Sequence, residues 1–203
     1  MVQPLRLMAE NLACDRGGRR VFNNINFTLN AGEMMELRGI NGSGKSSLLR
    51  LIAGLNAPSF GRVFLGNGTD DLTLGQHAMY VGHTDANKSL LTVRQNLDFW
   101  SKFMGGNASD EALDTFNLSA LSDYPVLLLS AGQKRRLALA RLVLARRPLW
   151  LLDEPTVGLD QQSFQKLQVS IISYLGTGGM IIAATHSELG VAPVQRLQLG
   201  MAE

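Results

Sequence analysis

A glycine-rich segment that ends in a lysine and a serine carries the clearest chemistry in the sequence. Its residues are Gly39, Ile40, Asn41, Gly42, Ser43, Gly44, Lys45 and Ser46, which fit the spacing G-x-x-x-x-G-K-[ST]. Glycines let a backbone wrap closely around a phosphate group, with the amide hydrogens pointing inward. A lysine ammonium at this place reaches the terminal phosphates, and the serine hydroxyl is a ligand of the kind that Mg²⁺ accepts. The spacing therefore predicts a nucleotide-phosphate site over 39–46.

Two adjacent acids follow a short apolar run much later in the chain. The run over 149–152 predicts a buried parallel strand, and Asp153 and Glu154 come at its carboxyl end. Ligands of parallel sheets bind at that edge. An acid there can hold Mg²⁺ through water, as expected for Asp153, and the next can polarise an attacking water, as expected for Glu154. Paired acids also end ordinary strands, so this pair has meaning only together with the phosphate loop.

The elements that must position these residues alternate between strands and helices. Glycine, asparagine and proline separate short apolar runs from segments with helical spacing, which predicts an α/β fold with a largely parallel sheet. Near the N-terminus, short apolar bursts broken by Gly17–Gly18 and Asn23–Asn24 predict strands joined by turns. Strands are expected over 33–38, 62–65, 78–81, 149–152 and 180–184, and helices after 46, from 92, from 109, over 131–147 and over 161–175.

A third segment indicates the class of protein. Ser130, Ala131, Gly132 and Gln133, preceded by a leucine, resemble the LSGGQ signature of ABC-type ATPases, with Ala131 in place of one glycine. The segment stands just before a predicted helix, whose N-terminus favours an anion. In that family the signature acts on the nucleotide of a second copy, so that two copies enclose two ATP molecules. The resemblance implies an ATP hydrolase that uses Mg²⁺ and works as a homodimer.

Further matches extend the resemblance over nearly the whole chain. The segment ending in Asp160 resembles the D-loop of the family, and His186 resembles the histidine that contacts the γ-phosphate. The family pattern implies that Glu154 and His186 are the catalytic residues. It also implies one P-loop NTPase domain over 1–203, with a RecA-like parallel core over about 1–82 and 129–203, an N-terminal antiparallel β subdomain and a compact helical insert over about 83–128.

Two positions depart from the family pattern. Many members stack an aromatic side chain on adenine where this sequence has Arg16, whose guanidinium plane can also stack on a base. Members usually carry a glutamine, that of the Q-loop, where this sequence has Thr84 after the strand over 78–81. We therefore expect Arg16 to contact the nucleotide, and we expect the shorter Thr84 side chain to alter the coupling at its loop.

The amino-acid sequence of the insert resembles that of one subfamily. Gly82–His83, Lys88, Leu91–Val93 and Asn96–Trp100 are similar to the matching run in ATP-binding subunits of heme exporters of cytochrome c maturation. The resemblance implies that membrane permease subunits are the partners and that ATP powers heme export or release of a heme carrier. It also implies a peripheral place on the cytoplasmic face of the bacterial inner membrane.

Aromatic residues of the insert have two interpretations. Phe99, Trp100 and Phe103 are candidates for a patch that docks on the membrane partner. The helical spacing of Leu97 and Phe103 instead favours a place in the insert's own core.

Composition excludes several classes of protein. With 45% hydrophobic and 18% charged residues, the chain is expected to be globular rather than disordered. No apolar run reaches the roughly 18 residues of a membrane span, and a single cysteine excludes a disulfide scaffold. A net charge of +2 argues against nucleic acid as a partner. The basic run Lys134–Arg136, with Arg141 and Arg146–Arg147, is expected on solvated faces of a helix.

Two other functions stay open at this point. An ABC exporter of lipoprotein or multidrug type would share every motif above. A non-transport ABC ATPase that acts on ribosomes or DNA commonly has two fused ATPase domains or long coiled-coil inserts. This chain has one signature, one phosphate loop and no sustained heptads, which favours the transporter class.

Overall fold

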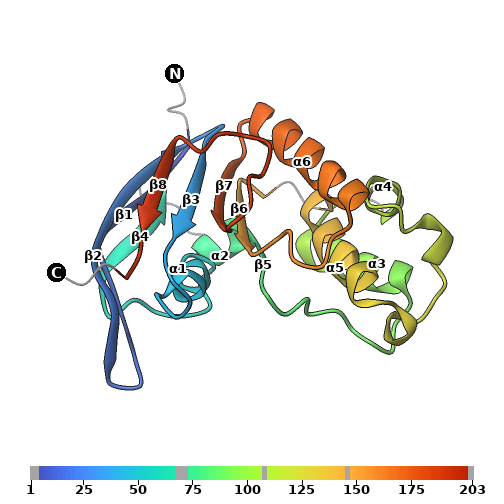
Figure 1. Cartoon of the computed structure of the whole chain (residues 1–203), viewed down its shortest axis with the longest axis horizontal. Coiled ribbons are helices and arrows are strands. Elements are labelled where there is room, and N and C mark those ends of the chain that lie inside the picture. The colour runs from blue at the N-terminus through green and yellow to red at the C-terminus, as the bar shows by residue number, and fades with distance from the viewer. Residues whose placement is uncertain (1–4, 67–72, 107–108, 145–146, 201–203) are drawn as a thin grey trace.

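The computed structural model describes residues 5–66, 73–106, 109–144 and 147–200, and Figure 1 shows its two sheets and the helices around them. The strands are β1 (Arg6–Arg16), β2 (Arg19–Asn30), β3 (Met34–Arg38), β4 (Phe60–Leu65), β5 (Ala78–Val81), β6 (Leu149–Asp153), β7 (Met180–Ala184) and β8 (Gln195–Gln198). The α-helices are α1 (Lys45–Ile52), α2 (Leu74–His77), α3 (Val93–Met104), α4 (Ser109–Thr115), α5 (Ala131–Ala140) and α6 (Gln161–Gly176). Three short 3₁₀ helices are η1 (Ser119–Leu121), η2 (Val126–Leu128) and η3 (Arg141–Val143).

The N-terminal sheet is antiparallel, with strand order β2-β1-β4. Gly17 and Gly18, at φ 55° and 74°, join β1 to β2, and positive φ at both positions suits a tight hairpin turn. The break expected at Asn23–Asn24 is wrong, because β2 runs through it. There the register between the two strands shifts and Asn24 has φ 51°. A bulge, which asparagine tolerates at positive φ, replaces the expected turn.

The second sheet is parallel, with strand order β5-β6-β7-β3-β8. Every residue of β6 and β7 is buried, which confirms the two apolar runs as central strands. The strand β8 at the sheet edge was missed. Its residues alternate between half-buried and exposed and are mostly polar, so the sequence pattern carries little apolar signal there.

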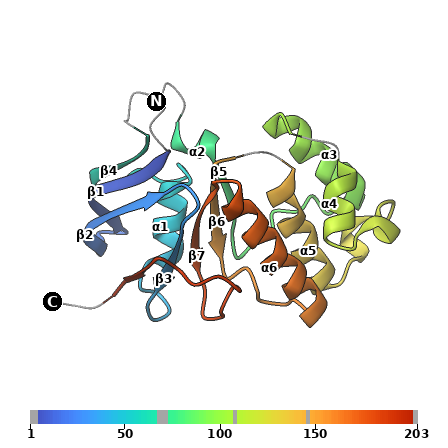
Figure 2. The same cartoon turned by 90° about the horizontal axis from the view of Figure 1, so that it is seen from above.

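Helices cover both faces of the parallel sheet. Leu149 and Leu151 of β6 pack with α1 and the antiparallel sheet, whereas Trp150 and Leu152 pack with α5 and α6. This division follows from the alternation of side chains along a strand. Figure 2 shows the resulting layers, with α1 on one side of the parallel sheet and α5 and α6 on the other. The described residues contain no helix long and apolar enough to cross a membrane.

Helices α3 and α4 with η1 and η2 connect β5 to α5. Thr92 caps α3 through a reciprocal pair of hydrogen bonds with Gln95, and Gly105 at φ 65° ends it. Leu97 is buried in the main core, as predicted. Phe103 is 72% exposed, so its expected place in the core is wrong. It lies on the outer side of α3 and stacks on Phe99.

The helix expected over 131–147 is shorter. It ends as an α-helix at Ala140 and tightens into η3, where Leu144 N donates to Arg141 O. Positions 145–146 of the expected helix lie outside the described residues. Pro148 disfavours helical backbone in the residue before it, which agrees with a non-helical position 147 but does not account for the change to η3 at Arg141. The short helix α2 was not predicted.

Candidate nucleotide site

The predicted phosphate loop joins β3 to the first turn of α1. Gly39, Gly42 and Gly44 have φ of 147°, 84° and 100°, and Gly39 and Gly44 also have close neighbours. A Cβ added to Gly39 would lie 2.4 Å from Ser43 Oγ, and one added to Gly44 would lie 2.6 Å from Val21 Cγ1. The loop thus holds a conformation that only glycine adopts freely. It leads directly into a helix N-terminus, where anions bind.

Lys45 closes this loop from inside. Its Nζ donates to Gly39 O at 2.7 Å and to Ile40 O at 3.2 Å, and the side chain is largely buried. The buried Ser43 Oγ has no hydrogen-bond partner among the described residues. Since a charged phosphate oxygen is a stronger acceptor for an ammonium group than a neutral carbonyl, these groups fit the phosphates of a nucleotide.

The loop, the paired acids and the segment after β5 border one pocket of about 330 Å³. The carboxyl ends of β3, β5 and β6 bring them together, at the edge where open α/β sheets bind ligands. The pocket is lined by Asn41, Gly42, Gly44, Lys45, Ser46, Ser47, His83, Asp153 and Glu154.

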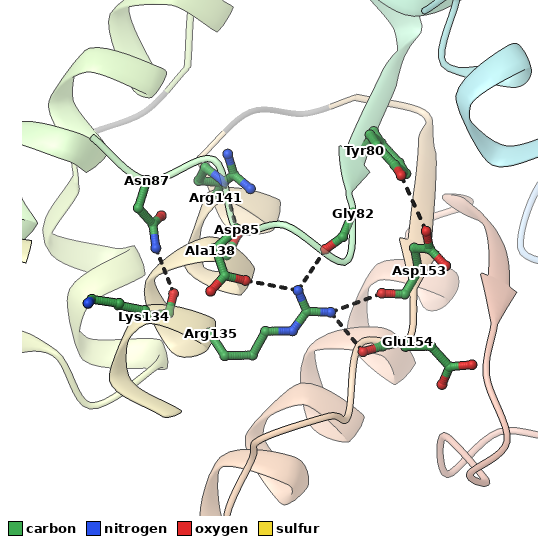
Figure 3. Close-up of polar contacts among 10 residues, drawn as sticks. All are labelled: Tyr80, Gly82, Asp85, Asn87, Lys134, Arg135, Ala138, Arg141, Asp153 and Glu154. Carbon is green, nitrogen blue, oxygen red and sulfur yellow. Dashed lines mark hydrogen bonds and ion pairs between the residues drawn. The ribbon is translucent and has the colours of Figure 1, made fainter. Parts of the chain in front are cut away.

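Ser46 and Asp153 form an oxygen donor set that fits Mg²⁺. Both line the pocket, and Asp153 is buried at the end of β6. Tyr80 OH donates to Asp153 Oδ2 at 3.4 Å (Figure 3), and burial raises the pKa of Tyr80. No cluster of three or more His, Cys, Asp and Glu suits a metal in the described part of the chain. Mg²⁺ in nucleotide sites needs few protein ligands, because phosphates and water supply the others.

Glu154 and His186 lie side by side at the ends of neighbouring strands. Glu154 has φ 47°, and its amide donates to Ala184 O of β7 at 2.8 Å. His186 Nε2 is 3.6 Å from Glu154 Oε1. A left-handed backbone is uncommon for a non-glycine residue. Here it turns the Glu154 side chain toward the pocket and the histidine, so the structure joins the two residues that were predicted to be catalytic.

Arg135 is a site residue that the sequence reasoning missed. It was expected on a solvated helix face, but it is only 5% exposed. Its guanidinium lies between Gly82 and Asp85 on one side and Asp153 and Glu154 on the other (Figure 3). The loop after β5, which covers this face of α5, comes from a distant part of the chain. The one feature of the sequence that could have indicated the burial of Arg135 is Asp85, which supplies the opposite charge.

Arg141 is a second correction to the expected solvated face. It is 3% exposed, and its guanidinium lies 4.9 Å from the centre of the Trp100 ring. Burial lowers its pKa to about 10. Its Nε donates to Ala138 O at 3.0 Å. The contact of the cation with the aromatic ring and the hydrogen bond to the carbonyl together compensate for the lost hydration of the charge.

The signature segment forms the first turn of α5 rather than a wall of the pocket. Ser130 Oγ accepts from Gln133 N at 3.2 Å, and Ser130 N donates to Gln133 Oε1 at 2.8 Å. This is a capping box. Ser130 and Ala131 are exposed, and a Cβ on Gly132 would lie 2.9 Å from Gly158 O of the predicted D-loop. Within the described residues, the segment stands apart from the phosphate loop of its own chain.

Asp160 caps α6 through its side chain, without a reciprocal bond within the described ranges. Its Oδ1 accepts from Ser163 N at 2.7 Å. The backbone hydrogen bond of Ser163, with its side chain, lowers the pKa of the Asp160 carboxyl. Asp160 itself is exposed, and it does not line the pocket among the residues described.

Arg16 and Thr84 are further predicted site residues outside the pocket lining, and so are Gly39, Ile40, Ser43 and His186. Arg16 is exposed at the end of β1, beside the hairpin turn, whereas Val21 and Phe22 of β2 lie against the phosphate loop. Thr84 is exposed, and its neighbour His83 lines the pocket instead. His83 lies two residues after the carboxyl end of β5, and this nearness was a signal for its place.

The chain is similar to known proteins over its full length. A family model described as ABC transporter matches residues 22–157. The cytochrome c biogenesis ATP-binding export protein CcmA of Rhodopseudomonas palustris is 46% identical over 97% of this chain and 98% of the relative. The protein of the same name from Mesorhizobium japonicum is 46% identical over 98% of this chain and all of the relative.

Solved structures agree with this relationship. A putative ABC transporter ATP-binding protein from Pyrococcus furiosus has the same fold, with a TM-score of 0.81 at 23% identity over 96% of this chain and 97% of that one. A dimeric ATP-binding cassette in a post-hydrolysis state, bound to ADP and phosphate, has a TM-score of 0.79 at 25% identity over 95% and 94% of the two chains. The α/β architecture with a parallel core and an N-terminal antiparallel sheet is therefore that of an ATP-binding cassette. From the family match and the near-complete overlap with its relatives, the chain belongs to the ABC transporter family and, within it, to the CcmA cytochrome c biogenesis ATP-binding export proteins.

Proposed function

We propose that this chain is the ATP-hydrolysing subunit of an exporter that moves heme, or releases a heme carrier, during maturation of c-type cytochromes. Its family and the names of its relatives, cytochrome c biogenesis ATP-binding export proteins, support this proposal. The observation that carries it is the Glu154–His186 pair, 3.6 Å apart, at the pocket that the phosphate loop borders.

The residues of the pocket divide the work of hydrolysis. The loop amides and Lys45 bind the β- and γ-phosphates of ATP. Ser46 and, through water, Asp153 would hold Mg²⁺, which would neutralise charge on the phosphate oxygens. Glu154 orients and polarises the water that attacks the γ-phosphorus, while His186 contacts the γ-phosphate. The bond to the β-phosphate oxygen then breaks, leaving ADP and phosphate.

A second copy of the chain completes the site. Ser130, Ala131, Gly132 and Gln133 lie apart from the phosphate loop of their own chain, at an exposed helix start. Such a helix N-terminus suits the γ-phosphate held by another chain. The dimeric cassette of similar structure supports this arrangement. ATP binding closes the dimer around two nucleotides, with Asp160 near the shared surface and Arg16 stacked on a base, and hydrolysis opens it again.

The partners in this proposal are membrane permease subunits of a heme exporter complex, and nucleic acid is not among them. The chain acts as one domain over 1–203, peripherally on the cytoplasmic face of the bacterial inner membrane. Its helical subdomain over about 83–128 meets the permease, while the core over about 1–82 and 129–203 holds ATP. Exposed Phe103, stacked on Phe99, gives that subdomain an apolar surface. Lys88 Nζ lies 4.3 Å from the centre of the Phe99 ring.

The test uses a variant that binds ATP without turnover. We expect Glu154→Gln to bind MgATP, to accumulate as a closed dimer and to hydrolyse ATP about 10²–10⁴-fold more slowly, since it lacks the base. The tagged variant is isolated from native membranes solubilised with MgATP, and the co-purifying proteins are identified. The Lys102→Ala variant, changed at an exposed residue of α3, is the matched control for turnover.

The outcomes separate the parts of the proposal. Heme-handling membrane proteins among the partners support heme export or carrier release. A permease of another kind contradicts the heme assignment and leaves the ATPase subunit. Capture of no membrane protein contradicts the subunit role, and near-normal turnover of the variant contradicts the role of Glu154.

A further inference from the structure

One buried side chain connects three parts of the nucleotide site. We propose that Arg135 is a positioning residue, which fixes the Asp153–Glu154 turn and the loop after β5 relative to the signature helix α5. The inference rests on the proposed role of Glu154 in polarising water. It adds a residue that touches neither ATP nor water but sets the geometry of the one that does.

The guanidinium uses its two terminal nitrogens on two different segments. Nη1 donates to Gly82 O at 2.8 Å and to Asp85 Oδ1 at 3.0 Å, both in the loop after β5. Nη2 donates to Asp153 O at 3.0 Å and to Glu154 O at 2.8 Å. Figure 3 shows the side chain spanning the gap between the loop and the turn. A planar fork of donors makes such a link rigid.

The link acts on the backbone of the proposed catalytic residue. Glu154 has φ 47°, which is a conformation that surrounding contacts must maintain. Its amide is held by Ala184 O at 2.8 Å, and its carbonyl is held by Arg135. The residue is thus fixed from both sides, by β7 and by α5. Loss of the Arg135 bonds frees the peptide that aims the carboxylate at the pocket.

The other end of the link lies on the loop that leads to the helical part. Asn87 Nδ2 donates to Lys134 O at 2.9 Å, which adds a second tie between this loop and α5 (Figure 3). Buried Asn96 holds the loop further along, accepting from Lys88 N at 2.8 Å and donating to Lys88 O at 3.0 Å. The loop is therefore held to α5 and α3, and a movement of α5 reaches Glu154 through Arg135.

A purely structural role for a buried arginine is the alternative, and Arg141 provides the comparison. It is as deeply buried as Arg135 and lies six positions further along the same helical stretch. Its guanidinium rests on Trp100, and Ala138 O, three positions earlier in the chain, accepts its Nε hydrogen. Among the described residues, it makes no hydrogen bond to the turn that carries Glu154. Asp85 is the acid that both arginines face.

The experiment compares equal changes at the two arginines. Turnover, ATP affinity and thermal stability are measured on the full chain for Arg135→Lys, Arg135→Met, Arg141→Lys and Arg141→Met. We expect kcat to fall about 10–100-fold in the Arg135 variants, because small displacements of a catalytic group have such effects. ATP affinity should stay within about threefold of wild type, since the phosphate loop is intact. The Arg141 variants should keep kcat within about threefold at a similar loss of Tm.

The lysine variant and a single-turnover measurement sharpen the test. Lysine keeps the charge near Asp85 but has one nitrogen, so it cannot serve the loop and the turn together. We expect Arg135→Lys to recover Tm relative to Arg135→Met, and not to recover the single-turnover rate of bound ATP. If Arg135→Met does not fold, Asp85→Ala removes one of the two loop bonds of Arg135 and leaves the bond to Gly82 O. It should therefore lower kcat less than Arg135→Lys.

Each other result overturns the inference. Normal kcat in Arg135→Lys shows that charge alone suffices, and parallel losses of kcat and Tm at both arginines show a structural role only. Normal turnover in Glu154→Gln instead contradicts the proposed function, in which Glu154 polarises the attacking water. Normal turnover confined to the Arg135 variants contradicts the positioning role alone.

Discussion

At the residue scale, Lys45 shows how the phosphate loop is preorganised for its ligand. Its ammonium is bound to two carbonyls of the phosphate loop, Gly39 O and Ile40 O, so the loop already has the curvature that a phosphate needs. Exchange of these neutral acceptors for charged phosphate oxygens strengthens the hydrogen bonds. Preorganisation of this kind reduces the ordering cost of binding.

We therefore expect Lys45→Ala to weaken ATP binding about 10–100-fold, because a hydrogen bond to a charged group contributes about 1.5–3 kcal/mol. Titration with a fluorescent ATP analogue measures the affinity. Lys102→Ala, which removes an exposed lysine of α3, is the control for loss of net charge and should bind as wild type does. Unchanged affinity in Lys45→Ala would contradict the assignment of the phosphate loop.

At the scale of secondary-structure elements, side-chain caps hold the N-termini of three helices. The three helices α3, α5 and α6 begin at Thr92, Ser130 and Asp160, each of which accepts a hydrogen bond from a backbone amide of the first turn. Such caps satisfy amides that have no partner within the helix. At α5 and α6 the caps coincide with the signature and the D-loop. Two residues predicted to act on ATP thus also have a local structural role in this chain.

The cap at Asp160 predicts a dependence of stability on pH. The hydrogen bonds from Ser163 lower the folded-state pKa of the carboxyl below its usual 3.8. Its contribution is therefore present above the unfolded pKa and is lost as the pH falls through the lower folded pKa. We expect Asp160→Ala to lower Tm by about 2–4 °C at pH 7, and this difference should shrink below about pH 4.

Thermal unfolding followed by circular dichroism over pH 2.5–7 measures this change, with the pH range set about the carboxyl pKa. Asp160→Asn is the matched control, because its amide oxygen can accept the same hydrogen bond without titrating. A Tm difference between wild type and Asp160→Ala that does not change with pH would contradict the prediction.

The edge of the parallel sheet organises the whole molecule. Segments that follow β3, β5, β6 and β7 are far apart in sequence, yet the strand order places their carboxyl ends side by side. The phosphate loop, His83, the Asp153–Glu154 pair and His186 meet there. Figure 1 shows the helical part beyond β5, at the end of the molecule remote from the antiparallel sheet. The loop between β5 and α3 is thus the direct connection from this part to the nucleotide site.

A glutamine placed in that loop should change the coupling to the membrane partner more than the rate of basal ATP hydrolysis. Thr84 is exposed and lies beside the pocket-lining His83, so a longer side chain fits without displacing buried groups. We expect Thr84→Gln to change basal ATP hydrolysis less than about twofold and to change the stimulation by the membrane partner more. ATPase assays with and without that partner measure both quantities.

Thr84→Ser is the control, because it keeps a short hydroxyl side chain in the loop. If Thr84→Gln changes neither basal nor stimulated hydrolysis, the assignment of Thr84 to the Q-loop position is wrong. His83, which lines the pocket, is then the residue of this loop that remains for that position.

Local patterns determined much of this protein. Glycine spacing and the lysine identified the phosphate loop, apolar runs identified β6 and β7, and Ser130 and Asp160 were placed at helix starts. These features depend on residues near one another in the chain, where backbone preferences and hydrogen bonds of the first turn act. The resemblance implied a catalytic role for Glu154 and for His186 separately, and the structure places His186 Nε2 3.6 Å from Glu154 Oε1.

Only the tertiary structure decided which polar and aromatic residues are covered. The loop after β5 buries Arg135, Trp100 covers Arg141, and α3 turns Phe103 toward solvent. Helical spacing shows where an apolar face lies, but it does not show which distant segment packs on a polar face. For the same reason β8 and the place of His83 were missed. The sequence by itself specified the chemical groups of the site and the elements that carry most of them. The packing of distant segments specified how those groups are held, because burial and hydrogen-bond partners across a fold are not local properties.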